Sequence, residues 1–180
     1  IVCLGEYLCS SNELFVDLMN EKAKELGMNN TNFVNATGFD DENHYTTAYD
    51  LALLTAAALK NSAFRTACSS KSAVLYYGNP PYRRTLTNHN KLLGNYEGII
   101  GVKTGFTKKS GRCLVTAAEG EGKRVIAVTL NDPDDWNDHR KLLDYGFANF
   151  AVANPVPPKE ELYEIPVSHG VSEFVTPVFE

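Results

Sequence analysis

Apolar residues recur with a helical period in the first third of the chain. In ELFVDLMNEKAKELG, residues 13–27, the positions that share one helical face are apolar except for one lysine, and this spacing predicts a helix. The stretch SSNE before it supplies a capping box, and the glycine at its end stops it. After a polar turn, Thr47 and Asp50 form a second capping arrangement in front of LALLTAAALK, which predicts another helix. A short helix is expected over residues 62–68.

Short apolar runs separated by turn residues replace this period from residue 72 onward. SAVLYY and YRRTLT flank a Gly-Asn-Pro-Pro turn and are predicted to be two strands. Three further strands are expected at residues 99–103, 113–118 and 124–130, and a glycine-containing loop joins the last two as a hairpin. The segment DPDD that follows predicts a helix start, with Asp132 as its cap and Pro133 in its first turn.

Proline spacing predicts a domain boundary near residue 154. NPVPPKEEL is typical of a semi-rigid linker. We therefore expect one domain over residues 1–154, followed by a linker and the first strands of a truncated β-rich domain over residues 155–180. At the other end, IVCLGEYLCSS has the pattern of the middle of an amphipathic helix with no capping residue before it. The chain is therefore expected to be cut out of a longer protein.

Composition and charge exclude several classes of protein. The net charge is −5 and no basic cluster exceeds two residues, which argues against a nucleic-acid partner. No apolar stretch approaches the 18 residues of a membrane span. The four cysteines contain no CxxC pair and the histidines lack ligand spacing, so neither a metal site nor another cofactor is expected. The cysteines are interpreted as small buried side chains.

Nucleophile motifs are missing from the sequence. No serine is followed three residues later by lysine, and the nearest match, CSSK at residues 68–71, has cysteine in the serine position and is interpreted as structural. The acidic FDDENHY is expected to be a solvated turn, because it lacks the alternation of a calcium loop. The remaining candidate is Lys103-Thr104-Gly105 at the end of a predicted strand. Its lysine and hydroxyl could together hold a carboxylate, and its glycine allows close approach of another backbone.

With its neighbouring segments, this tripeptide gives the chain a resemblance to a known family. The chain resembles the low-molecular-mass penicillin-binding proteins, the serine D-alanyl-D-alanine carboxypeptidases, over nearly all its length up to about Phe150. The matching segments include FVDLMNEKAKELGMNNTNFVNATGFDDENHYTTAYDLALL, TNHNKLL, GIIGVKTGFTKKSGRCLVTAA and LLDYGFANF. The resemblance implies an α+β, penicillin-binding/β-lactamase-like fold with an antiparallel sheet and helices, incomplete at the N-terminus, plus the start of a β-rich C-terminal domain.

The family uses three motifs, SxxK, SxN and KTG, and only KTG is expected to serve here. Ser10-Ser11-Asn12 does spell SxN, but in the family's order that motif should precede the helix resembled by IVCLGEYL, so we interpret these residues as a helix cap. The resemblance therefore implies that the nucleophile, its lysine base and the SxN serine are absent from this chain. A serine needs an adjacent base to attack an amide, so the isolated chain is expected to be inactive.

The resemblance also implies roles for individual residues. Lys103 and Thr104 would bind the terminal carboxylate of a peptidoglycan D-Ala-D-Ala peptide docked as an added strand, and Gly105 would leave room for its backbone. The main-chain N–H of Phe106 would be one of two oxyanion donors. Some relatives have arginine where this chain has His89, so a second cationic contact is not expected there.

The implied function is removal of the terminal D-alanine from peptidoglycan stem peptides through a serine acyl-enzyme. β-Lactam antibiotics would be covalent inhibitors of the full-length protein, which would lie outside the cytoplasm in the bacterial cell envelope. Surface left uncovered by the absent segment would favour association with another chain. The alternative is a non-catalytic module of the same fold that binds cell-wall peptide or a partner. A β-lactamase shares KTG but fits the flanking segments less well.

Overall fold

The computed structural model describes residues 1–153, 165, 166, 168, 174 and 175. The chain divides into two compact units, Ile1–Phe150 and Ala151–Glu180. In the second unit, strands β6 (Ile165–Pro166) and β7 (Phe174–Val175) pair antiparallel. The linker and β-rich segment expected at residues 155–180 otherwise lie outside the described residues.

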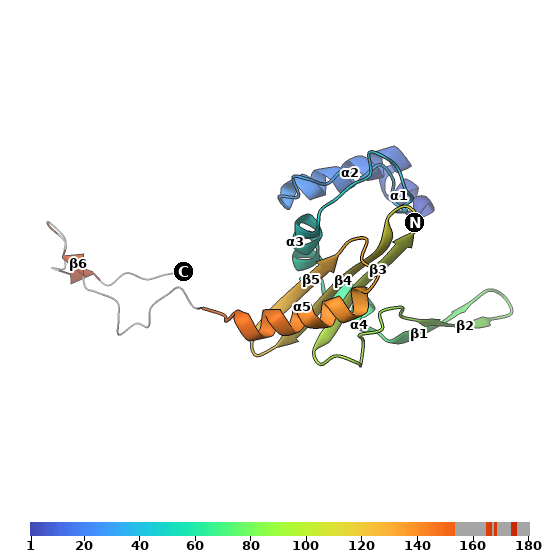
Figure 1. Ribbon diagram of the computed structural model, residues 1–180. Coiled ribbons are helices and arrows are strands. Elements are labelled where there is room, and N and C mark those ends of the chain that lie inside the picture. Colours follow the sequence, from blue (N-terminus) through green and yellow to red (C-terminus); the bar gives the residue numbers. More distant parts are fainter. Residues whose placement is uncertain (154–164, 167, 169–173, 176–180) are drawn as a thin grey trace. The chain divides into compact units, whose positions relative to one another are not determined.

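Two helices that pack against each other open the first unit (Figure 1): α1 (Val2–Cys9) and α2 (Asn12–Glu25). The cap of α2 is Ser11, whose side chain accepts a hydrogen bond of 3.2 Å from the main-chain N–H of Leu14. A serine cap is therefore present, but at Ser11 and not at the Ser10 that begins the S-x-x-E pattern, and it satisfies one of the orphan donors at the helix start. Both helices expose large apolar side chains: Leu4, Tyr7, Leu8, Leu14 and Leu18.

Helix α3 (Ala48–Ala58) begins as its sequence predicts, because Thr47 Oγ1 accepts a hydrogen bond of 3.1 Å from the N–H of Asp50. The carboxylate of Asp50 is buried, and its Oδ2 accepts hydrogen bonds from Asn30 N–H at 2.9 Å and Thr31 Oγ1 at 2.7 Å. A buried carboxylate needs such partners. Asp50 therefore fastens the loop after α2 to the start of α3.

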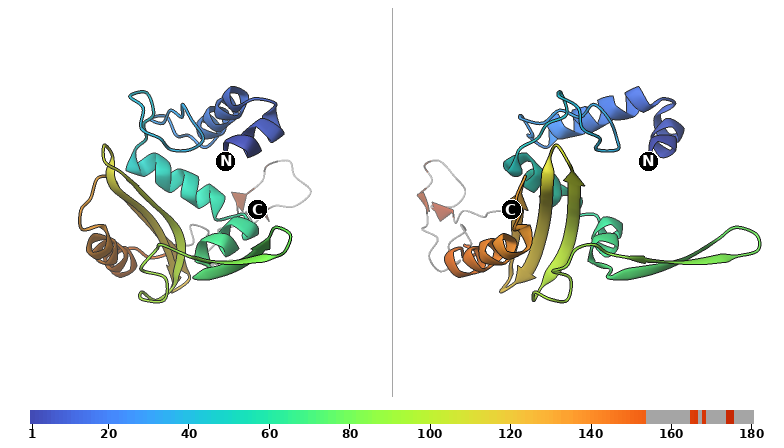
Figure 2. Two further views of the ribbon diagram at one scale, coloured as in Figure 1. Left: turned by 90° about the vertical axis from the view of Figure 1, so that its right-hand side faces the viewer. Right: turned by 45° about the vertical axis from the view of Figure 1, so that its right-hand side comes forward.

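A helix and a hairpin follow: α4 (Ser62–Ser69), β1 (Ser72–Tyr77) and β2 (Tyr82–Thr87). The two strands pair only with each other among the described residues, and every residue in them is exposed. Figure 2 shows this hairpin extending away from the rest of the unit. The predicted short helix and both predicted strands are confirmed.

The central sheet is antiparallel with strand order β3 (Ile99–Thr107), β4 (Gly111–Gly120), β5 (Lys123–Thr129). Helix α5 (Asp135–Asn149) covers one face, and α3 and α4 lie on the other (Figure 2). Each face has its own apolar cluster. One holds Leu59, Ile100, Val102, Val115 and Ala117, and the other holds Ala118, Ala127 and Leu143.

Three expectations about these elements are wrong. β3 continues to Thr107, so the KTG tripeptide lies inside the strand and not at its end. Helix α5 begins at Asp135, because Asp132 Oδ1 accepts a 3.0 Å hydrogen bond from the N–H of Asp134 and makes a turn ahead of the helix. The cysteines are not core residues, since one is exposed and the others are half-buried.

No helix in the described part of the chain has the length and apolar character needed to cross a membrane. In the same residues, no group of three or more histidine, cysteine, aspartate or glutamate side chains is placed to hold a metal ion.

A buried histidine lies between α5 and the sheet. His139 is fully buried, with Nδ1 2.6 Å from Thr116 Oγ1 and Nε2 3.1 Å from Thr129 Oγ1. Burial lowers the pKa of His139 to about 4, although nearby carboxylates, Asp135 first, oppose the shift. A charged imidazolium is costly to bury, so the native ring is neutral at pH 7.

This histidine is expected to make the protein less stable in mild acid. Between about pH 6.5 and pH 4 the unfolded histidine binds a proton and the native one does not, so the free energy of unfolding falls as the pH falls. From pH 7 to pH 4.5, the stability of wild type relative to His139→Asn should fall by about 2–3 kcal/mol, measured by urea unfolding. The exposed His89 is the control, because His89→Asn should follow the wild type at both pH values. A constant difference between wild type and His139→Asn would contradict the neutral native ring.

Candidate active site

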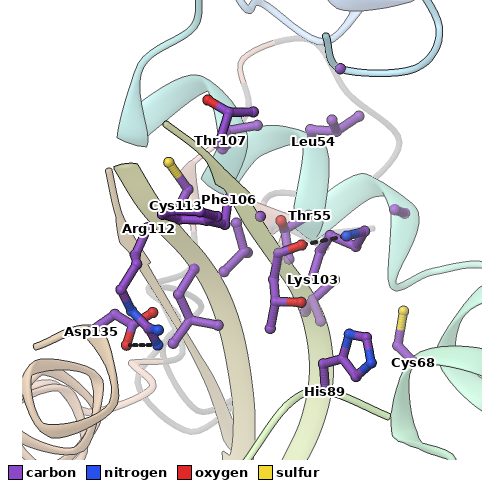
Figure 3. Close-up of a pocket in the computed structure, with 18 of the residues that line it drawn as sticks. Leu54, Thr55, Cys68, His89, Lys103, Phe106, Thr107, Arg112, Cys113 and Asp135 are labelled. Carbon is purple, nitrogen blue, oxygen red and sulfur yellow. Dashed lines mark hydrogen bonds and ion pairs between the residues drawn. The ribbon is translucent and has the colours of Figure 1, made fainter. Parts of the chain in front are cut away.

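A pocket of about 960 Å³ opens along strand β3 (Figure 3). Its walls come from the loop before α3, from α3 and α4, from the segment before β3, from β3 and β4, and from the start of α5. Four charged side chains line it, three cations and one carboxylate: Lys91, Lys103, Arg112 and Asp135. The excess of cations favours a negatively charged ligand.

The predicted site residues all lie in this pocket. Lys103 is exposed, and its Nζ donates a hydrogen bond to the main-chain oxygen of Thr104, which is half-buried. Gly105 is exposed, and Phe106 beside it is 70% exposed. Within the described residues β3 pairs only with β4. Its other edge can therefore accept an extended peptide as an additional strand.

The wall on the side of α4 depends on a glycine in β3. Gly101 has φ +131°, and a Cβ there would lie 2.7 Å from Cys68 Cβ. Glycine thus lets α4 pack directly on the strand that carries Lys103. Cys68 lines the pocket, where burial raises the pKa of its thiol and Lys103 opposes the shift. Cys68, which was expected to be a small buried side chain, is therefore a half-buried residue of the pocket wall.

An exposed aspartate fastens the loop before α3 to the end of the β3–β4 hairpin. Asp40 Oδ1 accepts hydrogen bonds of 2.8 Å from Thr107 Oγ1 and from Ser110 Oγ. The hydrogen bonds from Thr107 and Ser110 lower the pKa of the Asp40 carboxyl. The contact holds the rim of the pocket, where Thr37 and Gly38 lie, against the strand end.

An asparagine-rich loop positions His89 and Lys91 at the pocket. The side chain of Asn88 donates to the main-chain oxygens of Cys68 and Ser70, both at 3.1 Å, and so ties this loop to the end of α4. Asn90 is buried, and its Oδ1 accepts from Leu92 N–H at 2.9 Å. The two asparagines shape the loop and leave His89 exposed at the pocket.

The opposite wall was missed by the sequence analysis. Arg112 Nη2 donates a 2.7 Å hydrogen bond to Asp135 Oδ1, and its Cζ lies 5.7 Å from the ring centroid of Trp136. Figure 3 shows Arg112 and Asp135 together on one side of the pocket, with Lys103, His89 and Cys68 on the other. The arginine and the carboxylate are 23 residues apart in sequence. No short-range pattern joins them, and only the β3–β4 register would have pointed to the arginine.

Comparison with known protein families shows to which family the chain belongs. The sequence profile of the D-alanyl-D-alanine carboxypeptidases matches residues 1–134. The chain belongs to this family. In D-alanyl-D-alanine carboxypeptidases the KTG motif accompanies a serine–lysine pair, and in this chain it occupies the pocket edge of β3.

Curated carboxypeptidases match over most of this chain. DacF of Bacillus subtilis is 33% identical over 177 residues, which cover 97% of this chain and 45% of the relative. The D-alanyl-D-alanine carboxypeptidase of Streptomyces sp. strain K15 is 38% identical over 151 residues, covering 80% of this chain and 52% of the relative. The chain thus spans about half the length of the curated relatives it matches.

Solved structures of the family share the fold. The Streptomyces K15 DD-transpeptidase superposes with a TM-score of 0.70 at 37% identity, over 75% of this chain and 54% of that one. A D-alanyl-D-alanine carboxypeptidase from Mycobacterium tuberculosis H37Rv gives 0.72 at 29% identity, over 83% and 58%. The penicillin-binding type of α+β fold expected from the sequence is confirmed for the described helices and antiparallel sheet.

Proposed function

We propose that this chain forms the substrate-carboxylate half of a D-alanyl-D-alanine carboxypeptidase, which removes the terminal D-alanine from peptidoglycan stem peptides. The observation that carries the proposal is the position of Lys103-Thr104-Gly105 on the open edge of β3, inside a pocket lined by more cations than carboxylates. A peptide carboxylate is the anion that such an edge would bind.

The substrate backbone would lie along the free edge of β3 as an extra strand, held by main-chain hydrogen bonds. Lys103 and Thr104 would hold its terminal carboxylate through charge-assisted hydrogen bonds, and Gly105 would allow the backbones to approach. The N–H of Phe106 would donate to the oxyanion that forms on the scissile carbonyl. One such donor contributes about 2.7–4 kcal/mol to lowering the barrier.

The nucleophile in this proposal is a serine activated by the lysine of an SxxK motif, and that motif does not occur in the 180 residues. The serine would form an acyl-enzyme with the substrate or with a β-lactam. Because its proposed substrate is peptidoglycan, the protein would lie outside the cytoplasm, in the bacterial cell envelope. No step of the proposed reaction requires a metal or another cofactor.

Two preparations test the proposal: the full-length protein and the 180-residue chain alone. The full-length protein should release D-alanine from an N-acyl-D-Ala-D-Ala peptide and should be labelled covalently by fluorescent penicillin. The isolated chain should do neither, because it lacks the serine–lysine pair. Peptide binding without release of D-alanine by the full-length protein would support a non-catalytic module of the same fold. Labelling of the isolated chain would contradict the assignment of the nucleophile to another segment.

A further inference from the structure

The β1–β2 hairpin exposes large apolar and aromatic side chains on an element that projects from the first unit (Figure 2). Their exposed fractions run from 41% to 68%, and the side chains are Val74, Leu75, Tyr76, Tyr77, Tyr82 and Leu86. Among the described residues no further strand pairs with the hairpin. A two-stranded hairpin with nothing packed on it is marginally stable in water, and clustered apolar surface marks an interaction site. The hairpin is therefore built to contact a partner.

The charge of the hairpin indicates the chemistry of this partner. Residues 71–91 contain no aspartate or glutamate, and their charged side chains are Lys71, Arg83, Arg84 and Lys91, whereas the whole chain has a net charge of −5. Arg83 and Arg84 lie in β2 and are exposed, and neither forms an ion pair with another described residue. Cations presented in this way attract an anionic partner.

Rings and cations lie on both faces of the hairpin. Opposite residues of antiparallel strands share a face, so the register places two groups: Leu75, Tyr77, Tyr82, Arg84 and Leu86 on one face, and Val74, Tyr76 and Arg83 on the other. Near the turn, the rings of Tyr77 and Tyr82 meet edge to face with centroids 5.4 Å apart. A protein partner would cover one face and leave the other in water. The headgroup layer of a bilayer surrounds an inserted tip and contacts both faces.

A second copy of the chain fits this hairpin less well than a lipid surface does. Arg84 lies opposite Leu75, in the middle of the more apolar face. Stacking this face on the same face of a copy would bury two arginines of like charge without a counter-ion, which is costly. Guanidinium groups pair well with phosphate, and tyrosine rings are enriched at the headgroup level of membranes. Phospholipid therefore satisfies both kinds of side chain.

We propose that the β1–β2 hairpin docks on an anionic phospholipid surface, with Tyr77 and Tyr82 at the headgroup level and Arg83 and Arg84 on lipid phosphates. The contact lies in the interface and does not cross the bilayer. No residue of β1 or β2 lines the pocket beside β3, so this surface is separate from the proposed active site and does not depend on the proposed function.

The first test measures co-sedimentation of the full-length protein with vesicles, made either of phosphatidylcholine alone or of an equal mixture with phosphatidylglycerol. The wild type should prefer the anionic vesicles. The double variant Arg83→Gln/Arg84→Gln should bind them roughly 30-fold more weakly, because each cation near an anionic surface contributes about a factor of five. Both arginines are exposed, so the melting temperature should stay close to that of the wild type.

The β3–β4 turn provides the matched control, since Lys108 and Lys109 are also adjacent, exposed cations of a hairpin. Lys108→Gln/Lys109→Gln removes the same charge and should bind the anionic vesicles as the wild type does. Equal weakening of both double variants would mean that only net charge matters, and would overturn the inference. Equal binding of the wild type and the arginine variant would overturn it as well.

A tryptophan probe at the tip tests whether the hairpin itself touches lipid. With anionic vesicles, the added emission of Tyr82→Trp should shift to shorter wavelength and should be quenched by brominated lipid. The same change at Tyr49 in α3, which is 71% exposed, should show neither effect. An unquenched tryptophan at position 82 in a protein that sediments would assign the binding to another segment. A shift that grows with protein concentration in the absence of vesicles would favour a second copy. Either result overturns the proposal.

Discussion

Replacing Lys103 with alanine is expected to slow acylation of the full-length protein by penicillin roughly 100-fold, because a charge-assisted hydrogen bond to the ligand carboxylate contributes about 1.5–3 kcal/mol. The melting temperature should stay close to that of the wild type. Lys103 is exposed on the pocket edge of β3 and donates only to the main-chain oxygen of Thr104 among the described residues, so its truncation leaves no buried cavity. The measurement is a time course of fluorescent-penicillin labelling alongside thermal melts.

Lys109 is the control for the loss of a positive charge. It is exposed in the turn between β3 and β4 and does not line the pocket. Lys109→Ala should be acylated at the wild-type rate. If Lys103→Ala is acylated at the wild-type rate, Lys103 does not bind the ligand carboxylate. If Lys103→Ala and Lys109→Ala are slowed equally, Lys103 acts only through general electrostatic attraction of the ligand.

Leu143→Ala is expected to have the largest effect on stability, with a loss of about 2–5 kcal/mol in the free energy of unfolding. Leu143 is fully buried in the cluster between α5 and the sheet, and its truncation leaves a cavity that the strands cannot fill. The preceding residue offers the same chemistry on the other side of the helix, since Leu142 is 43% exposed. Leu142→Ala should change stability by no more than about 0.5 kcal/mol.

Urea unfolding of both leucine variants measures this difference. Similar losses for the two variants would mean that α5 does not pack on the sheet through the face that carries Leu143. A small loss for Leu143→Ala alone would mean that the cluster repacks around the missing side chain.

Local sequence signals were sufficient for most elements of the fold. The cap formed by Thr47 and Asp50 depends on residues three apart, and the three strands of the sheet follow one another along the chain. Hydrophobic period and turn chemistry act over these same distances. The predicted bounds were wrong where strand pairing or a competing turn decides where an element begins or ends. β3 runs on to Thr107 because β4 pairs with it there, although Phe106 is the only apolar side chain after Val102 in this strand.

The site was predictable only on the strand that carries the motif. Lys103 and its neighbours were found because they adjoin each other in sequence. The side chains that surround them come from other elements, such as Cys68 from α4 and Asp135 from α5. Their positions follow from how the helices pack on the two faces of the sheet, which no short window of sequence contains.

The order of the strands has a consequence for how the pocket assembles. β3, β4, β5 and α5 follow one another along the chain and are joined by short connections, so little loop-closure entropy opposes their association. Lys103, Thr104 and Arg112 lie in one hairpin, and Asp135 follows Arg112 after 23 residues, and contacts of smaller sequence separation are associated with faster folding. The wall from α3 and α4 requires closure of longer loops. The anion-binding half of the pocket is therefore expected to be formed first, as a nucleus on which the remaining wall docks.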